Sequence, residues 1–289
     1  MNTWAFQNHI LAWHTKHGRH LLPWRPPAGK QVKQSDPYKI LVSEVMLQQT
    51  QVSRVIEKYR LFLKKFPTVT ALARARTPTL LKTWQGLGYN RRALYLRETA
   101  RAIARDCGGA FPRDAKTLEA LPGIGPSTAR AIAVFAWNQP EIFIETNIRR
   151  VFIHFFFKHK KKVSDRDILP LIQKTLYHKN PRMWYSALMD YGAMLGETLQ
   201  EENPNRKSSQ YTTQSTFIGS NRYARAKILA FVLLRPSTTQ KSIMSYMNKN
   251  PALKPLIKKA PQVLHTLADE GFLRKRGRYW KIADSSTLQ

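Results

Sequence analysis

Cysteine, acidic side chains and long apolar runs are all scarce in this sequence. Cys107 is the one cysteine among 289 residues, so the chain forms no internal disulfide and no metal site built from several cysteines. A chain without disulfides is typical of a reducing compartment, and we expect a cytoplasmic protein of bacterial type. The most apolar run near the start, Ile10–Trp13, is too short to span a membrane, and no signal-peptide pattern precedes it. We therefore expect no membrane partner.

The shortage of acids leaves a large positive charge. Lys and Arg number 48 against 18 Asp and Glu, which gives a formal net charge of +30, and the basic residues are spread along the whole length. Surface charge alone serves solubility, but an excess this large and this distributed favours a polyanionic partner, which we take to be nucleic acid. With 43% apolar residues, the chain can also bury full cores in two or three small domains.

A glycine-containing turn leads directly into a helix-like run in the middle of the chain. Residues 121–125 read Leu-Pro-Gly-Ile-Gly, and the glycines let the backbone turn tightly. The helix start that follows presents unpaired N–H groups to an anion. We interpret the turn as a helix-hairpin-helix clamp that holds a DNA strand without reading its sequence, although a plain helix–helix connection gives the same pattern. The contacting residues would be Pro122, Gly123, Gly125 and Ser127.

The apolar pattern is helical over nearly the whole chain, so we expect an all-α fold. Helices are predicted at residues 4–17, 38–50, 51–65, 77–84, 91–106, 115–120, 126–137, 146–158, 165–178 and 181–195. The β-like piece Glu141–Ile144 is too short to define a sheet. After a polar stretch at 196–222, three predicted helices (222–234, one beginning near 240, and 260–270) lead into two short strands around a basic turn. That order describes a winged helix-turn-helix module.

Two acidic residues stand out from their surroundings. Glu44 lies in a helix that is apolar on nearly all sides, where an acid is rarely buried without a partner. It is either salt-bridged, or part of a polar stripe with Gln48 and Gln51, or a carboxyl with a raised pKa ready to donate a proton. Glu145 either caps the helix that follows it or faces a sugar on which positive charge develops. A protonated and an ionised carboxyl on separate helices form a sensible pair for cleaving a glycosidic bond, and Asn147 would hold the carboxylate or the sugar.

Six motifs, in order along the chain, resemble one family. The segment at 43–52 reads Ser-Glu-Val-Met-Leu-Gln-Gln-Thr-Gln-Val and closely resembles MutY-type adenine DNA glycosylases of the helix-hairpin-helix superfamily. The other matching segments are 23–25, 66–69, 84–89, 120–125 and 189–194. The likeness covers roughly residues 4–195, and it implies a two-lobed helix-hairpin-helix glycosylase fold.

The resemblance also implies roles for the two acids. Glu44 would protonate the purine leaving group at N7, because a neutral base leaves far more readily than an anion. Glu145 would stand where the family has an Asp that stabilises the oxocarbenium-like sugar, with Asn147 beside it. Glu is one methylene longer than Asp, and the changed reach can alter rate or substrate.

Further roles follow for residues that would contact DNA. Gln48 and Gln49 would enter the base stack, and Tyr89 would wedge into the duplex to help extrude the nucleotide. Arg25 would line the adenine pocket. Asp190 would be a pocket-side acid, unless it lies on a helix surface.

Position 127 and the segment that begins at Gly196 bear on the type of reaction and on the cofactor. Ser127 stands where bifunctional relatives carry a Schiff-base Lys, so we expect a monofunctional enzyme that attacks with water and leaves an abasic site. The family usually binds an iron–sulfur cluster through four cysteines, but Gly196 occupies the first such position and 197–215 contains no cysteine. We therefore expect no cluster and no other cofactor, and whether a monovalent cation binds the carbonyl groups of the hairpin turn stays open.

The C-terminal part differs as well. MutY proteins typically end in a domain that reads 8-oxoguanine opposite adenine, and residues 222–283 are too short and too helical for it. The basic turn with Arg276 and Arg278 would contact DNA, unless the module binds protein instead. We expect three domains: residues 1–28 with 138–220, residues 29–137 with the hairpin, and residues 221–289.

The sequence as a whole predicts a monomeric, nucleoid-associated DNA glycosylase of base excision repair. Its substrate would be duplex DNA with a mismatched or damaged base, most simply adenine opposite 8-oxoguanine or G. Two alternatives stay open. One is a glycosylase for uracil, thymine or hypoxanthine, although pyrimidines lack an N7 for Glu44 to protonate. The other is an inactive lesion-binding protein.

Overall fold

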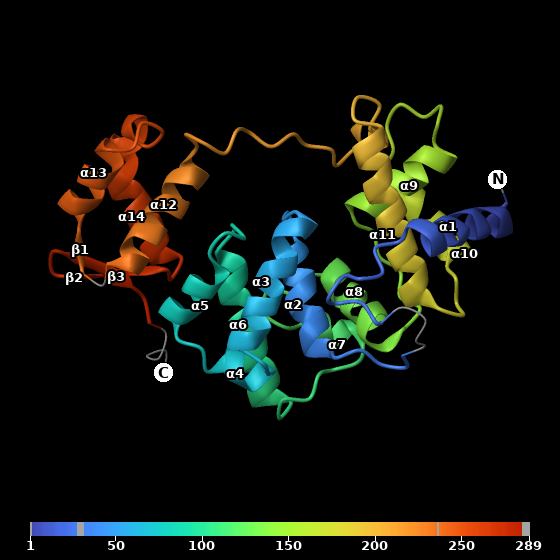
Figure 1. The fold of residues 1–289 in the computed structure, drawn as a ribbon, viewed down its shortest axis with the longest axis horizontal. Coiled ribbons are helices and arrows are strands. Elements are labelled where there is room, and N and C mark those ends of the chain that lie inside the picture. Colours follow the sequence, from blue (N-terminus) through green and yellow to red (C-terminus); the bar gives the residue numbers. More distant parts are fainter. Residues whose placement is uncertain (1, 28–31, 236, 285–289) are drawn as a thin grey trace. The chain divides into compact units, whose positions relative to one another are not determined.

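The computed structural model describes residues 2–27, 32–235 and 237–284 (Figure 1). Contacts divide the chain into two units, each made of two separate stretches. Unit 1 comprises Met1–Val45 and Ala110–Thr213, and unit 2 comprises Met46–Gly109 and Gln214–Gln289. The predicted three-domain division remains a proposal, and its boundary between residues 28 and 29 lies outside the described residues.

Unit 1 is helical, with its core around the longest helix. Its elements are α1 (Thr3–His17), most of α2 (Pro37–Leu47), α7 (Ala115–Glu119), α8 (Pro126–Trp137), α9 (Thr146–Phe156), α10 (Asp165–Thr175), α11 (Pro181–Thr198) and the short 3₁₀ helix η1 (Pro204–Lys207). Helix α11 packs against α9 and α1. Phe6, Phe152 and Trp184 are fully buried there, and the ring of Phe6 meets the other two edge-on with centroids 5.5 and 5.6 Å away. Aromatic burial of this kind supplies much of the packing energy of a small core.

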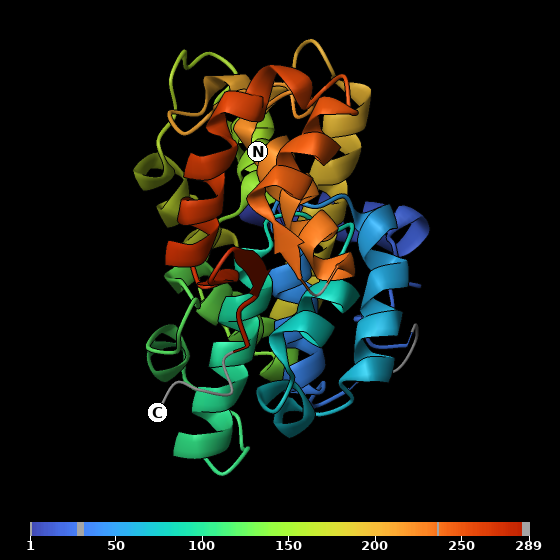
Figure 2. The same cartoon turned by 90° about the vertical axis from the view of Figure 1, so that its left-hand side faces the viewer.

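Unit 2 joins a helical part to the C-terminal module. Its elements are α3 (Val52–Lys65), α4 (Val69–Ala73), α5 (Thr77–Trp84), α6 (Arg91–Asp106), α12 (Asn221–Leu234), β1 (Thr238–Thr239), α13 (Gln240–Asn248), η2 (Lys254–Lys259), α14 (Ala260–Asp269), β2 (Leu273–Arg276) and β3 (Tyr279–Ile282). The three strands form an antiparallel sheet in the order β1-β3-β2. Three helices and this small sheet confirm the winged-helix-like module (Figure 2).

The predicted helices are confirmed with small shifts at their ends. The predicted helix at 181–195 runs on to Thr198, and the one at 146–158 ends at Phe156. Sequence periodicity missed α4, because five residues are too few to show a helical period; the Thr68 side chain caps it by accepting from the backbone N–H of Ala71. Glu141–Ile144 forms no strand, and the polar stretch 196–222 contains η1.

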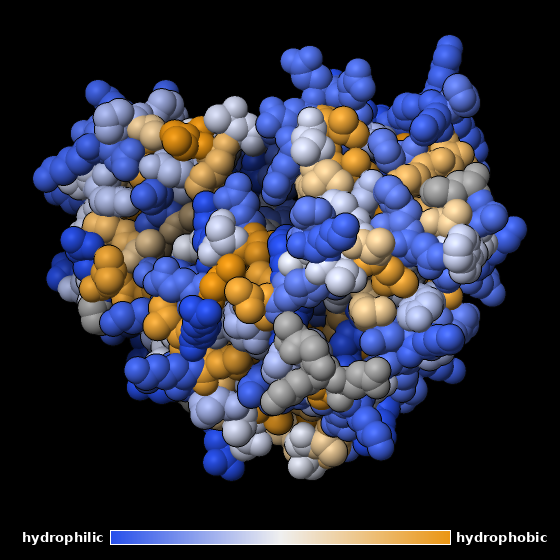
Figure 3. All heavy atoms as spheres, turned by 45° about the vertical axis from the view of Figure 1, so that its right-hand side comes forward, coloured by the Kyte–Doolittle hydropathy of each residue, from blue (hydrophilic) through white to orange (hydrophobic). Residues whose placement is uncertain are grey.

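Hydrophilic residues cover most of the face drawn in Figure 3, with smaller hydrophobic areas between them. This agrees with the excess of Lys and Arg in the sequence. Among the residues that the structure describes, no helix combines the length and the apolar character needed to cross a membrane.

Candidate active site

Glu44 is a half-buried acid in α2, between the buried residues Ser43 and Val45. In the described part of the chain no ion pair reaches its carboxyl group, so the salt-bridge interpretation finds no support. Burial raises the pKa of Glu44 to about 8, and the nearby carboxyl group of Glu145 adds to the rise. Glu44 is therefore protonated at neutral pH and can donate a proton.

Glu145 is the N-cap of α9. Its Oε1 accepts hydrogen bonds from the backbone N–H groups of Asn147 and Ile148, both at 2.8 Å, and the Asn147 amide donates to Oε2 at 3.4 Å. The capping interpretation of Glu145 is thus correct, and it is compatible with a role in chemistry. Burial raises the pKa of Glu145, while these N–H groups and the guanidinium groups of Arg149 and Arg150 favour its ionised form.

The two acids together form an unequal pair. The Glu44 carboxyl is desolvated by burial, whereas the carboxylate of Glu145 accepts bonds from a helix N-terminus. Burial raises the pKa of both groups, but at Glu145 the helix N–H groups and two guanidinium groups favour the ionised form. Of the two, Glu44 is therefore the better candidate for a proton donor and Glu145 the better candidate for an anion.

Arg150 ties this site to the segment after α11. Its guanidinium donates to Asn147 Oδ1 at 2.8 Å, to the carbonyl of Gly192, and to Asn203 Oδ1 at 3.1 Å. Gly192 has to be glycine, since a Cβ there would lie 2.2 Å from the Asn147 carbonyl oxygen. Sequence analysis missed Arg150, although its place three residues after Asn147 on a helix gave a signal.

The segment that begins at Gly196, where the family carries its cluster ligands, is held in place by contacts with other parts of unit 1. Asn205 donates to the carbonyl of Thr146 at 2.9 Å, and Val163 forms an isolated β-bridge with Ser208. Four thiolates are needed to hold a [4Fe–4S] cluster, and the single cysteine of the chain, Cys107, lies in unit 2 at the end of α6. The residues present do not fit such a cluster. In the described ranges, no three His, Cys, Asp or Glu residues are grouped so as to hold a metal ion.

Arg25 and Asp190 bind each other rather than lying apart. Asp190, on α11, is 2% exposed, and its carboxylate accepts from the Arg25 guanidinium at 2.6 and 2.8 Å. Arg19 donates to it as well at 2.6 Å, and His14 Nε2 lies 3.4 Å away. Burial alone would raise the pKa of Asp190, but the hydrogen bonds and positive charges of these partners hold it well below its usual range. Asp190 is thus an internal anchor of unit 1.

Gln48, Gln49 and Tyr89 gather in unit 2, held by Arg92. The Arg92 guanidinium donates to the carbonyl groups of Gln48 and Leu87, the latter at 3.1 Å. It thereby joins the turn after α2 to the turn before α6. Gln49 and Tyr89 have positive φ angles of 54° and 43°, which residues with a side chain rarely adopt. Tyr89 is 42% exposed, so its ring is available to a ligand.

The hairpin turn and the basic turn present their predicted residues to solvent. Gly123 has a φ of 78°, which explains the glycine, and Gly125 is the N-cap of α8. Pro122 and Ser127 are exposed on either side. Arg276 and Arg278 flank the β2–β3 turn, also exposed, and Arg278 lies over the Tyr279 ring at 5.2 Å.

Comparison with known proteins gives consistent matches. Residues 42–173 match the family described as HhH-GPD superfamily base excision DNA repair protein. An adenine DNA glycosylase of Buchnera aphidicola subsp. Baizongia pistaciae is 37% identical over 201 residues, covering 68% of this chain and 54% of that protein. One of Mycobacterium tuberculosis (strain H37Rv) is 44% identical over 142 residues, covering 49% of this chain and 44% of the relative. This chain thus spans about half the length of the curated relatives it matches.

A solved structure supports the same assignment. A thermostable thymine-DNA glycosylase superimposes with a TM-score of 0.57 at 26% identity, over 66% of this chain and 86% of that one. The family match includes Glu44, the hairpin turn and Glu145. Residues 42–173 thus match the HhH-GPD superfamily of base excision DNA repair proteins, and the chain is similar to MutY-type adenine DNA glycosylases.

Proposed function

We propose that this protein is a monofunctional DNA glycosylase that hydrolyses the N-glycosidic bond of a flipped, mispaired purine. The base would be adenine opposite 8-oxoguanine or G, as the names of the relatives suggest. The observation that carries the proposal is the unequal carboxyl pair, in which burial raises the pKa of Glu44 to about 8 while Glu145 accepts two hydrogen bonds from a helix N-terminus that favour its ionised form.

In the proposed reaction, Glu44 donates its proton to N7 of the adenine. The glycosidic bond then breaks, its electron pair goes to the base, and positive charge develops on the sugar. Glu145 stabilises that charge, and water adds to the anomeric carbon, gives a proton back to the Glu44 carboxylate and leaves an abasic site. Asn147, fixed by Arg150, orients the Glu145 carboxylate.

The remaining contacts would bind the duplex. The hairpin residues Pro122, Gly123, Gly125 and Ser127 would hold a strand phosphate. Gln48, Gln49 and Tyr89 would enter the base stack, and Arg276 and Arg278 would contact the backbone. Arg25 and Asp190 would support the adenine pocket from behind. We propose that the enzyme acts as a monomer at the bacterial nucleoid, without an iron–sulfur cluster and without another cofactor.

A panel of duplexes tests the substrate. The protein is incubated with A opposite 8-oxoguanine, A opposite G, and U, T or hypoxanthine opposite G, and alkali then reveals abasic sites. We expect product from the adenine duplexes. The resemblance to a thymine-DNA glycosylase makes the T·G duplex the most informative competitor. Product only from a duplex with uracil or thymine would refute the choice of adenine as the base. Product from none of the duplexes would refute the proposal that the protein is a glycosylase.

Ser127 leads to a prediction about strand cleavage. A serine cannot form a Schiff base, so borohydride should trap no covalent complex between the wild-type protein and its substrate. Ser127→Lys places an amine at this exposed position at the start of α8, and we expect it to yield a trapped complex. Ser53→Lys, also exposed at the start of a helix, is the matched control. Trapping by the wild type would contradict the monofunctional assignment.

Arg150 leads to a prediction about positioning. Arg150→Lys keeps a positive charge near Glu145 but cannot donate to three acceptors in the fixed geometry of a guanidinium. We expect the single-turnover rate of excision to fall about tenfold while DNA affinity stays within about twofold, because a misplaced carboxylate costs rate rather than binding. Arg105→Lys, on an exposed site of α6, should change neither quantity. Equal loss of affinity and rate would place Arg150 in DNA binding instead.

A further inference from the structure

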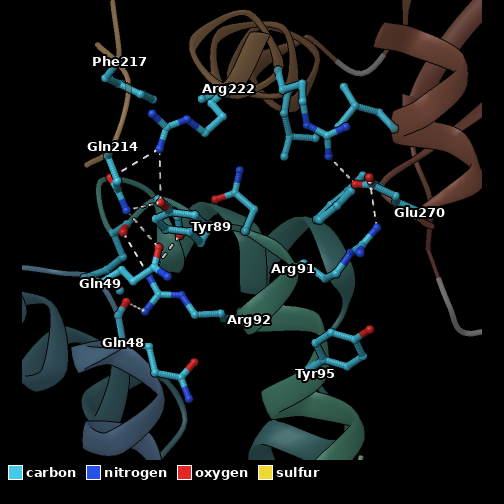
Figure 4. A pocket seen from close by; sticks show the side chains of 18 of the residues that line it. Gln48, Gln49, Tyr89, Arg91, Arg92, Tyr95, Gln214, Phe217, Arg222 and Glu270 are labelled. Atoms are coloured by element: carbon cyan, nitrogen blue, oxygen red, sulfur yellow. Dashed lines mark hydrogen bonds and ion pairs between the residues drawn. The ribbon is translucent and has the colours of Figure 1, made fainter. Parts of the chain in front are cut away.

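A cavity of about 850 Å³ opens in unit 2 beside Tyr89 (Figure 4). One side is formed by the turns that carry Gln49 and Tyr89. The other is formed by residues of the C-terminal module and the segment leading into it, among them Gln214, Phe217 and Arg222. The cavity therefore joins the part of the chain that resembles MutY proteins to the part that does not.

Direct hydrogen bonds connect the two sides. Gln214 Nε2 donates to the hydroxyl of Tyr89 at 3.1 Å and to Gln49 Oε1 at 3.3 Å. Arg222 donates to the same hydroxyl at 3.2 Å and to the carbonyl of Ser215 at 2.8 Å. Tyr89 thus contacts Arg222 of the module, and Gln49 contacts Gln214 in the segment that leads into it.

The lining has the chemistry of a nucleotide site. Tyr89 and Phe217, which is 51% exposed, offer aromatic faces on which a base can stack. Side-chain amides from Gln49 and Gln214 offer donors and acceptors to a base edge. Glu270 is the one acid among the described lining residues, and it is ion-paired with arginines at positions 91 and 225. Because arginines outnumber acids in the lining, the cavity has a net positive charge.

The nucleotide that this cavity takes differs from the one that is excised. Neither acid of the carboxyl pair that would act on the excised base, Glu44 or Glu145, lines the cavity. Extrusion of one base leaves its partner in the opposite strand unpaired, with its hydrogen-bonding edge unsatisfied. Resting on the proposed glycosylase function, we propose that the cavity binds this opposite-strand nucleotide and that Gln214, Phe217 and Arg222 determine which opposite bases are accepted.

Excision rates on different mismatches test the specificity. Single-turnover rates are measured for A opposite 8-oxoguanine, G and C, with the wild type and with the double variant Gln214→Ala/Arg222→Ala. We expect the ratio of the excision rate on the fastest duplex to that on the slowest to fall about tenfold in the variant, because contacts to a base edge contribute about that factor to discrimination. The matched control is Gln262→Ala/Arg235→Ala, in the same module and outside the cavity, which should keep the wild-type ratio.

Binding without chemistry gives a second measurement. The duplex carries 2-aminopurine opposite a tetrahydrofuran abasic analogue, which cannot be cleaved. We expect the wild type to change the fluorescence of 2-aminopurine and Phe217→Ala to lose at least half of that change, because the stacking surface is removed. An unchanged mismatch ratio together with an unchanged fluorescence response would overturn the inference, even if the wild type excises adenine. No excision by the wild type with the fluorescence response retained would instead refute the glycosylase and support the nucleotide site.

Discussion

Glu44→Gln is expected to abolish base excision and to make the protein more stable at alkaline pH. The amide has the shape of the protonated carboxyl group but cannot donate a proton to a leaving base, so we expect the single-turnover rate to fall by at least about 10²-fold. DNA affinity should stay close to that of the wild type, because the side chain carries no charge at neutral pH. The rate is measured on A opposite 8-oxoguanine, and the affinity on a duplex with an abasic analogue.

The stability effect follows from the direction of the pKa shift. Burial raises the pKa of Glu44 to about 8, so between pH 4.5 and 8 the folded state keeps a proton that the unfolded chain has released. Stability attributable to Glu44 is therefore complete below about pH 4.5 and is lost as the pH rises through 8. Glutamine does not titrate, and Glu44→Gln should gain about 2 kcal/mol in free energy of unfolding at pH 8, less than the full shift because solvent screens the carboxyl.

From the same shift we expect base excision by the wild type to fall above pH 8, where Glu44 loses the proton that it would donate. Urea unfolding at pH 5 and pH 8 checks the stability effect. Glu57→Gln is the matched control, since Glu57 is exposed on α3 and should change neither rate nor stability. Full activity of Glu44→Gln would rule out the acid role. If the difference in free energy of unfolding between Glu44→Gln and the wild type were the same at pH 5 and pH 8, the Glu44 carboxyl would not be desolvated.

Asp190→Asn is expected to destabilise unit 1 severely. The carboxylate is buried and serves as the common acceptor for Arg25, Arg19 and His14, so its neutralisation leaves buried positive charge without a counterion. Removal of one member of a buried ion pair costs about 3–5 kcal/mol. The free energy of unfolding, measured in urea at pH 7 by tryptophan fluorescence, should be lower in the variant by that amount; Trp184 is one of the buried tryptophans that report on the core of unit 1.

The pH dependence separates this effect from a simple loss of packing. The pKa of Asp190 is held below its usual range, so its stabilisation is present above about pH 4 and fades as the pH falls through the folded-state pKa. The difference in free energy of unfolding between wild type and Asp190→Asn should therefore become smaller at acid pH. Asp106→Asn, which breaks an exposed pair with Arg105, should cost less than about 1 kcal/mol. If the difference between wild type and Asp190→Asn stayed constant from pH 7 to pH 3, the charge of Asp190 would not be the cause of the destabilisation.

The hairpin at 121–125 and the helices around it follow from local sequence. Gly123 needs positive φ, Asp114 caps α7 through the N–H of Thr117, and apolar residues repeat at helical spacing, so each element is determined by its own residues. The module after residue 220 could be predicted for the same reason, since its strands flank a turn at Gly277. Short elements such as α4 were missed because a period needs more than one turn to appear.

The sequence by itself also determined which residue types were available. It has two candidate catalytic acids, a single cysteine where a cluster needs four, and a large positive charge. Only the tertiary structure decided what surrounds them. Whether Glu44 is paired or desolvated depends on groups brought to it by folding, and so does the carboxylate–guanidinium anchor between Asp190 and Arg25, 165 residues apart. Contacts over such separations leave no trace in local periodicity, because burial and charge pairing are properties of the folded chain. Gln214 and Arg222 show the same limit: a polar stretch that reads as a linker supplies the partners of Tyr89.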